Sequence, residues 1–223
     1  MTYHKAVLLT ECIEGLNIKP NGIYVDVTFG GGGHSIEILK HLVDGKLFAF
    51  DRDDDVLENI PNDKNLKLIQ TNYKNIKRFL RSEGVTKVDG ILADLGVSSH
   101  QFDVAERGFS FRFDSELDMR MNKSALLSAR KVVNEYSEED LANLFFKYGE
   151  IRISRKLAKL IVLAREEKEI VTTTDLLEIL DGLVPEKRRN QFLSQVFQSI
   201  RIEVNQEIES LKQMLIDGVD LLN

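Results

Sequence analysis

Apolar positions in the first part of the chain follow two alternating periods. Four short runs rich in β-branched and other apolar residues predict buried strands. Between them, residues 34–42 and 75–82 repeat their apolar positions every three or four residues, which is typical of amphipathic helices. Strands that alternate with helices predict right-handed crossovers and a parallel, doubly wound α/β sheet. The predicted strands are residues 23–27, 46–50, 66–69 and 88–93.

The pattern changes after the fourth predicted strand. Residues 95–122 hold glycines, serines and charges without a clear period, which predicts a long loop, and loops of that length are usually functional or disordered. The rest of the chain has helical spacing. Ser137 and Asp140 have the form of a capping box, and a further helix starts at Thr174. Residues 189–222 keep their apolar positions in register and predict one last helical stretch.

The predicted sheet is small. With four strands, residues 88–93 would form an exposed apolar edge, which is an aggregation template unless another segment covers it. Residues 216–223 have the pattern of a helix end that leads toward a further strand. We therefore expect this chain to be a shortened version of a longer protein.

Composition and charge narrow the class of protein. The 223 residues are 43% hydrophobic and 30% charged, which is typical of a folded globular protein. The single cysteine, Cys12, excludes a disulfide framework, and no histidine spacing suits a metal, so we expect no metal site. With no apolar run of about 18 residues and no signal peptide, we expect a cytoplasmic protein without membrane contact. A net charge of -6 disfavours a wholly basic nucleic-acid coat but allows a local basic face.

Four successive glycines, Gly30 to Gly33, occupy the turn from the first strand into the first helix. Without Cβ atoms, the backbone there can be approached closely by a ligand. The free N–H groups of a helix start favour a negative group such as a carboxylate or phosphate. The position matches the ligand crevice of open α/β sheets, and a merely flexible turn is the alternative.

Asp51 ends the second predicted strand. A carboxylate at this place can accept hydrogen bonds from the ribose hydroxyls of an adenosine-containing ligand. Three further aspartates follow closely, so a solvated acidic turn is the alternative. A calcium loop is excluded, because Val56 stands where that loop needs glycine and Asn62 where it needs glutamate.

The spacing of the glycines indicates which adenosine-containing cofactor the turn would bind. The dinucleotide pattern G-x-G-x-x-G fails in both registers, because Ser35 or Ile36 stands at the third glycine. No P-loop lysine follows the glycines, which disfavours a nucleotide triphosphatase. The pattern favours S-adenosylmethionine over NAD, and an NAD-dependent oxidoreductase is the weaker alternative.

Asp94 follows the fourth predicted strand. The carboxyl ends of the first and fourth strands meet at the switch point of such sheets, so we expect Asp94 in the same crevice as the glycines. Its carboxylate could bind the cofactor or accept a proton from an amine nucleophile, which makes it our candidate catalytic residue. A helix N-cap is the alternative.

Arginine and aromatic residues mix in residues 106–111 and 117–121. Such side chains pair with phosphate and stack on bases, although a lid loop would have the same composition. Further basic residues recur in the helical part, where a solvated helix face is the alternative to a phosphate-contacting surface. The candidate RNA-binding residues are Arg107, Arg120, Arg152, Arg155, Lys187 and Arg188.

Together these segments resemble one family, the bacterial 16S ribosomal RNA cytosine-N4 methyltransferases. The resemblance runs over nearly the whole chain, and the segments around Asp94 and Arg107 are its most specific parts. The segments that carry it are residues 3–9, 26–35, 89–99, 106–111, 117–121, 148–150 and 200–207.

The resemblance implies a Rossmann-like class I methyltransferase sheet with an inserted all-helical domain. It implies a core at residues 1–120, an RNA-binding helical insertion at 121–200 and a returning helix at 201–223. The implied reaction transfers a methyl group from S-adenosylmethionine to N4 of a cytosine in the decoding region of 16S rRNA, with the small ribosomal subunit as partner. The implied cofactor contacts are Gly32, Gly33, His34, Asp51, Tyr73, Asp94 and Gln101.

Three departures from the family pattern bear on function. Tyr73 stands where the family often has phenylalanine, and the aromatic ring is kept. Residues 191–196 lack the His-Pro-Ala-Thr-Arg-Thr run, so no arginine role is carried over there. Family members also continue past this C-terminus with the last strands of the sheet. A non-catalytic remnant that keeps cofactor or RNA binding is therefore an alternative, and a homodimer is left open.

Overall fold

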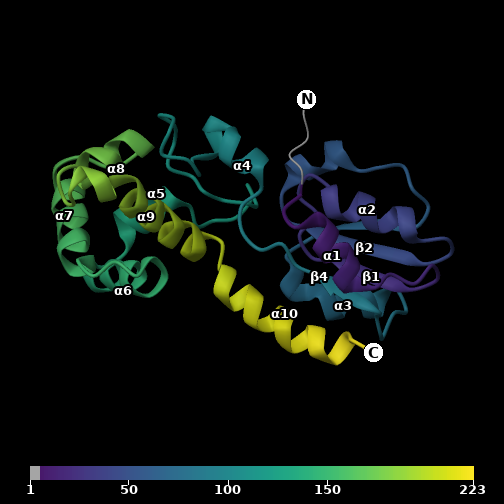
Figure 1. Cartoon of the computed structure of the whole chain (residues 1–223). Helices are drawn as coiled ribbons and strands as arrows, with labels where there is room; N and C mark the ends of the chain where they lie inside the picture. The colour runs from purple at the N-terminus through teal and green to yellow at the C-terminus, as the bar shows by residue number, and fades with distance from the viewer. Residues whose placement is uncertain (1–5) are drawn as a thin grey trace. The chain divides into compact units, whose positions relative to one another are not determined.

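The computed structural model describes residues 6–223 (Figure 1). Its internal contacts divide the chain into two compact units. The sheet unit comprises Met1–Ser98 and Ile208–Asn223, and the helical unit comprises Ser99–Glu207. The helical unit is therefore an insertion in the chain of the sheet unit.

The sheet unit contains a four-stranded parallel sheet in the order β3-β2-β1-β4. The predicted strands and their parallel pairing are confirmed, although β4 is shorter than expected. Its predicted first residue, Val88, instead bridges to Leu222 at the end of the chain. The strands are β1 (Ile23–Asp26), β2 (Lys46–Asp51), β3 (Leu66–Gln70) and β4 (Gly90–Leu92).

Helices cover both faces of this sheet, as a parallel sheet requires. The two predicted helices appear as α2 (Gly33–His41) and α3 (Ile76–Ser82), and α1 (Leu9–Leu16) adds one that the sequence analysis did not predict. Successive strand residues face opposite layers. Tyr24 packs in the cluster that contains α2 residues, and Val25 packs in the cluster that contains α3 residues.

The last helix, α10 (Glu207–Leu221), belongs to the sheet unit from Ile208 onward. Met214 and Leu221 enter the same apolar cluster as Val88 and Leu80 of α3. The backbone N–H of Val88 donates to the carbonyl of Leu221 at 2.8 Å. The C-terminal end of α10 thus lies beside the start of the β4 edge and covers part of it.

The helical unit forms a bundle in which α6 packs against both α7 and α9 (Figure 1). Ser137 caps α6 by accepting from the N–H of Asp140, as expected. The reciprocal capping box is formed instead at α8, by Thr172 and Asp175, and this helix begins one residue before its expected start at Thr174. The helices are α4 (Ser99–Asp103), α5 (Ala129–Glu135), α6 (Glu138–Gly149), α7 (Ser154–Glu167), α8 (Thr173–Leu180) and α9 (Arg189–Val204).

Two expectations about the helical part need correction. Residues 95–122 are not all loop, because α4 lies within them. The single stretch expected at 189–222 is two helices, α9 and α10, which belong to different units. Gln206 lies between them with φ 49°, a left-handed conformation that does not continue a right-handed helix.

The unit boundaries also differ from the expected ones at 120 and 200. Residues 99–120 group with the helices because the N–H of Leu117 donates to the carbonyl of Val171, and that of Ala129 to Asp118. Residues 201–207 remain with α9 up to the break at Gln206. Among the described residues, no helix is long and apolar enough to cross a membrane.

Candidate functional site

The glycine turn follows β1 at the carboxyl edge of the sheet. The N–H of Phe29 still pairs with the carbonyl of Phe50 at 2.9 Å, and the N–H of Gly32 then closes the turn onto the carbonyl of Phe29 at 2.7 Å. Gly30 has φ 52° and Gly32 has φ 78°, which L side chains rarely adopt. A Cβ at Gly32 would also lie 3.0 Å from the Phe29 ring. The turn is therefore a defined conformation that requires glycine.

Asp26, the last residue of β1, holds this turn from below. Its fully buried carboxylate accepts from Ser35 Oγ at 2.7 Å and from the N–H of Thr28 at 3.0 Å. Burial raises the pKa of Asp26, and these hydrogen bonds lower it in part. The contacts tie the start of α2 to the end of β1. The sequence analysis did not single out Asp26, although a lone acid inside an apolar strand was the available signal.

Asp51 ends β2 and contacts the glycine turn. One carboxylate oxygen accepts from the N–H of Gly30 at 2.8 Å, and the other accepts from the N–H of Asp53 at 2.9 Å. Burial raises the pKa of Asp51, while the backbone N–H groups of Asp53, Gly30 and Arg52 lower it in part. An ionised carboxylate has about four acceptor sites, so Asp51 keeps acceptor capacity beside these N–H groups.

Asp94 follows β4 and is joined to the end of β1. Its backbone N–H donates to Thr28 Oγ1 at 2.7 Å. Its side chain is 52% exposed, and one carboxylate oxygen lies 4.0 Å from Nδ1 of His34. The His34 ring is buried, with Nε2 3.1 Å from the carbonyl of Val7. The structure thus places His34 and Asp94 beside each other at the switch point between β1 and β4.

The two remaining predicted cofactor contacts lie in different units. Tyr73 starts the 3-10 helix η2 (Tyr73–Asn75) just beyond β3, half-buried against the core of the sheet unit. Gln101 is buried on α4 of the helical unit. Tyr73 therefore lies at the same carboxyl edge as Asp51, while a cofactor role for Gln101 stays a prediction.

Two predicted RNA contacts bind other groups of the protein itself. Arg107 is only 4% exposed, and its guanidinium donates to the carbonyls of Arg120 and Met121 at 2.9 and 3.2 Å. Arg120 donates twice to Asp118, at 2.6 and 3.0 Å. The role expected for Arg107 needs correction, because a buried guanidinium bound to carbonyls cannot contact a phosphate. The motif around Arg107 is a structural one.

The other four predicted RNA contacts are exposed. Arg152 precedes α7, Arg155 lies in its first turn, and Lys187 and Arg188 form part of the 3-10 helix η4 (Glu186–Arg188). None of the four forms an ion pair with another residue of the range 6–223. Their charges are therefore directed to solvent.

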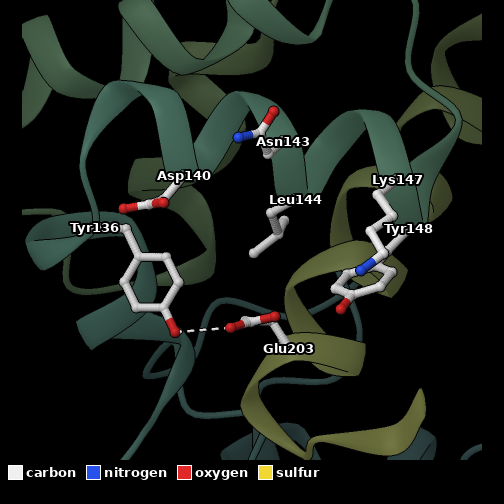
Figure 2. Close-up of a pocket in the computed structure, with 7 residues that line it drawn as sticks. All are labelled: Tyr136, Asp140, Asn143, Leu144, Lys147, Tyr148 and Glu203. Atoms are coloured by element: carbon white, nitrogen blue, oxygen red, sulfur yellow. Dashed lines mark hydrogen bonds between the residues drawn. The ribbon is translucent and has the colours of Figure 1, made fainter. Parts of the chain in front are cut away.

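The helical unit also contains a cavity of about 420 Å³, shown in Figure 2, that the sequence analysis missed. The Tyr136 hydroxyl donates to a Glu203 carboxylate oxygen across it at 2.8 Å. Burial and this carboxylate raise the pKa of Tyr136, which keeps the phenol protonated as a donor. The available signal in the sequence was a mixture of polar and apolar residues on one face of α6. The lining residues are Tyr136, Asp140, Asn143, Leu144, Lys147, Tyr148 and Glu203.

The sheet unit combines a glycine turn after β1, an acid after β2 and an aspartate after β4 in one parallel sheet. This is the architecture of Rossmann-like α/β domains that bind nucleoside cofactors, among them the class I methyltransferases. The model of the MraW methylase family matches residues 1–223, and the chain belongs to this family.

Curated relatives carry one common name, ribosomal RNA small subunit methyltransferase H. The relative from Flavobacterium johnsoniae is 57% identical over 100% of this chain and 74% of its own length. That from Flavobacterium psychrophilum is 55% identical over 97% and 75%, and that from Bacteroides fragilis strain YCH46 is 54% identical over 99% and 73%. The chain thus spans about three quarters of these relatives' length.

A solved structure of a putative methyltransferase from an antibiotic biosynthesis pathway of Anabaena variabilis is a distant match. It is 14% identical, with a TM-score of 0.32, and the match covers 90% of this chain and 86% of that one. This similarity is too low to support an inference about either protein.

Proposed function

We propose that this chain transfers a methyl group from S-adenosylmethionine to N4 of a cytosine in the decoding region of small-subunit rRNA. The observation that carries the proposal is the family match over the whole chain, with relatives above 50% identity that are named as small-subunit rRNA methyltransferases. The target atom and the rRNA region follow from the resemblance of the Asp94 and Arg107 segments. The proposed partner is the small ribosomal subunit in the cytoplasm.

The residues at the carboxyl edge of the sheet fit this cofactor. The backbone of Gly31 is exposed at the start of α2, and Asp51 keeps acceptor capacity for the ribose hydroxyls. Residues 93–96 after β4 are exposed as well, which leaves their backbone accessible. When bound, the cofactor supplies an electrophilic sulfonium methyl group. The residues of the sheet unit that would hold it are Gly32, Gly33, His34, Asp51, Tyr73 and Asp94.

Cytosine N4 is a poor nucleophile, so residues of this chain have to increase its reactivity. The N4 lone pair of cytosine is delocalised into the ring, and a paired base is inaccessible, so the base must be unpaired or flipped out. An acceptor for an N4 hydrogen localises the lone pair and takes the proton. We assign this task to the Asp94 carboxylate, because its backbone is anchored to Thr28 while its side chain remains exposed.

Replacement of Asp94 by asparagine tests this assignment. Asp94→Asn should bind S-adenosylmethionine within about threefold of the wild type, because we expect residue 94 to contact the cofactor through its backbone, which stays anchored to Thr28 in the variant. Methyl transfer at saturating cofactor should fall by about 100-fold, as loss of a general base usually causes. Calorimetry measures the first quantity, and single-turnover transfer to unmodified 30S subunits measures the second.

The matched control is Asp44→Asn, an exposed aspartate in the turn before β2 at the opposite edge of the sheet. It should leave both quantities unchanged. Unchanged turnover in Asp94→Asn would contradict the assignment. Cofactor binding without any methyl transfer by the wild type would instead favour the non-catalytic alternative. Light scattering on the same samples distinguishes a monomer from a homodimer.

A further inference from the structure

The hydroxyl of Thr28 lies where two loops of the sheet unit meet. Thr28 is the second residue after β1, and Asp94 is the second residue after β4. At the ends of these strands, the backbone N–H of Val27 donates to the carbonyl of Leu92 at 2.9 Å. One step further along both loops, the N–H of Asp94 donates instead to Thr28 Oγ1 at 2.7 Å. Beyond the strands, a side chain therefore joins the two loops.

The groups around the Thr28 hydroxyl determine the direction of its hydrogen bonds. A hydroxyl oxygen that accepts from a backbone N–H still has its own hydrogen to donate. Asp26 Oδ1 lies 3.3 Å from Thr28 Oγ1, and an ionised carboxylate can only accept. The hydroxyl therefore donates to Asp26 and accepts from Asp94. Donation to an anion also makes the hydroxyl oxygen a stronger acceptor, because consecutive hydrogen bonds polarise one another.

Asp26 connects this arrangement to the start of α2. Its Oδ1 also accepts from the N–H of Thr28 at 3.0 Å, and its Oδ2 accepts from Ser35 Oγ at 2.7 Å. Ser35 is buried in the first turn of α2, directly after His34. The Asp26 carboxylate is buried and has donors on both oxygens, so its position is well defined. The start of α2 and the backbone of Asp94 are thus held by the same carboxylate, the second of them through Thr28.

The position of the Asp94 backbone determines what the Asp94 carboxylate can reach. This side chain is 52% exposed, and its distance of 4.0 Å from Nδ1 of His34 is longer than a hydrogen bond. A group that takes a proton from a nucleophile must lie within hydrogen-bond distance of it. A displacement of about 1 Å in an active site can cost a factor of about 100 in rate. The bond from Asp94 to Thr28 is therefore expected to affect the rate of the reaction.

We propose that Thr28 is a positioning residue for methyl transfer, and that its hydroxyl holds the backbone of Asp94 at a fixed distance from the start of α2. The hydroxyl does so by donating to the buried Asp26 carboxylate while it accepts from the N–H of Asp94. This inference rests on the proposed function and on the role assigned there to Asp94. The opposing hypothesis is that Thr28 only stabilises the fold of the glycine turn.

Thr28→Val tests this role, because valine has nearly the same shape as threonine and lacks the hydroxyl. In the full chain without cofactor, NMR should show the backbone N–H of Asp94 exchanging with solvent at least about tenfold faster than in the wild type, since it loses its acceptor. The N–H of Val27 should keep its protection, because its acceptor is the carbonyl of Leu92.

The kinetic effect of Thr28→Val should appear in turnover. Methyl transfer at saturating cofactor and 30S subunits should fall by about tenfold or more. Affinity for S-adenosylmethionine should stay within about threefold of the wild type, because the glycine turn and Asp51 keep their own contacts. Thr28→Ala removes the hydroxyl without placing a methyl group against the Asp26 carboxylate, and it should show the same changes even if Thr28→Val does not fold.

Thr28→Ser is the rescue variant, since it keeps the hydroxyl. It should restore both the protection of the Asp94 N–H and the turnover to within about twofold of the wild type. Thr71→Val is the matched control. Thr71 is likewise partly buried just beyond a strand, β3, and its hydroxyl accepts from Asn75 at 3.3 Å. This control should leave turnover unchanged, and urea denaturation establishes that each variant is folded.

Three results would overturn the inference in a wild type that transfers methyl groups. The first is unchanged turnover in folded Thr28→Val and Thr28→Ala, and the second is a Thr28→Ser variant as slow as these two. The third is an Asp94 N–H that stays protected without the hydroxyl. Failure of the proposed function is distinguishable, because a wild type that binds S-adenosylmethionine and transfers no methyl group to rRNA would overturn that function, and the positioning role with it, whatever the exchange rates.

Discussion

At the scale of single residues, the carboxylates around the glycine turn differ in what they do. Asp26 is buried and bound to Ser35 and Thr28, so it holds the backbone. Asp51 contacts the turn and keeps acceptor capacity, while Asp94 remains half exposed. Position after a strand was enough to predict that Asp51 and Asp94 lie at the carboxyl edge of the sheet, and their roles stay predictions. The inward direction of Asp26 depends on which face of β1 is buried at its last residue, which the sequence pattern alone does not settle.

Asp51→Asn should lower the affinity for S-adenosylmethionine by about tenfold, because a neutral amide accepts weaker hydrogen bonds than a carboxylate. The pKa of Asp51 is raised, so its carboxylate becomes protonated at a higher pH than an ordinary aspartate. Wild-type affinity should therefore fall as the pH is lowered toward the acid range, and this fall should be absent in Asp51→Asn. Calorimetry as a function of pH measures both, and parallel pH profiles would contradict the role.

The contrast between buried and exposed arginines gives a second test at this scale. Arg107→Ala should lower the free energy of unfolding by about 2 kcal/mol, because it leaves the carbonyls of Arg120 and Met121 without their donor. Arg152→Ala should change stability by less than about 0.5 kcal/mol and reduce the salt slope of RNA binding by about one. Urea denaturation and salt titrations measure these effects. A stable Arg107→Ala with weakened RNA binding would restore the original hypothesis.

At the scale of elements, periodicity predicted the strands and most helices, but it did not predict where α9 ends and α10 begins. The helix break at Gln206 was hidden because α9 and α10 keep their apolar residues in one register across it. Asn205, the residue before the break, forms hydrogen bonds with a distant segment. Its side chain accepts from the N–H of Met121 at 2.9 Å and donates to the carbonyl of Met119 at 2.7 Å. Contacts between residues so distant in sequence are not visible in a local pattern.

The capping box of α8 makes a prediction about stability and pH. Asp175 accepts from the N–H of Thr172 at 2.9 Å and from Lys168 at 2.6 Å. The bond from Lys168 is the largest of the causes that lower the pKa of Asp175 to about 2. Asp175→Asn should therefore cost about 1 kcal/mol of unfolding free energy at pH 7.

The sign of the pH effect follows from this lowered pKa. The stabilisation by Asp175 is fully present above the ordinary aspartate pKa of 3.8 and is lost as the pH falls toward about 2. The stability difference between the wild type and Asp175→Asn should shrink over that window in urea denaturation experiments. A difference that stays constant down to pH 2 would show that the ionised carboxylate is not what stabilises the helix start.

At the scale of the whole molecule, the chain forms two units, because the helical unit is inserted in the chain of the sheet unit. Periodicity predicted an α/β sheet followed by a helical part, and the resemblance to the methyltransferase family implied that this part is an insertion. It did not predict that residues 99–120 belong to the helices, since hydrogen bonds such as that from Leu117 to Val171 join segments far apart in the chain. The cavity lined by α6 was not predicted either, because its lining includes Glu203 of α9, which is far from α6 in the sequence.

Nucleoside analysis of rRNA after reaction with this chain tests the proposed methyl transfer to cytosine N4. Unmodified 30S subunits are incubated with the chain and S-adenosylmethionine that carries a labelled methyl group, and the digested rRNA is examined by mass spectrometry. We predict labelled N4-methylcytidine from one site in the decoding region. Label on another base or atom, or no label although calorimetry shows bound cofactor, would contradict it.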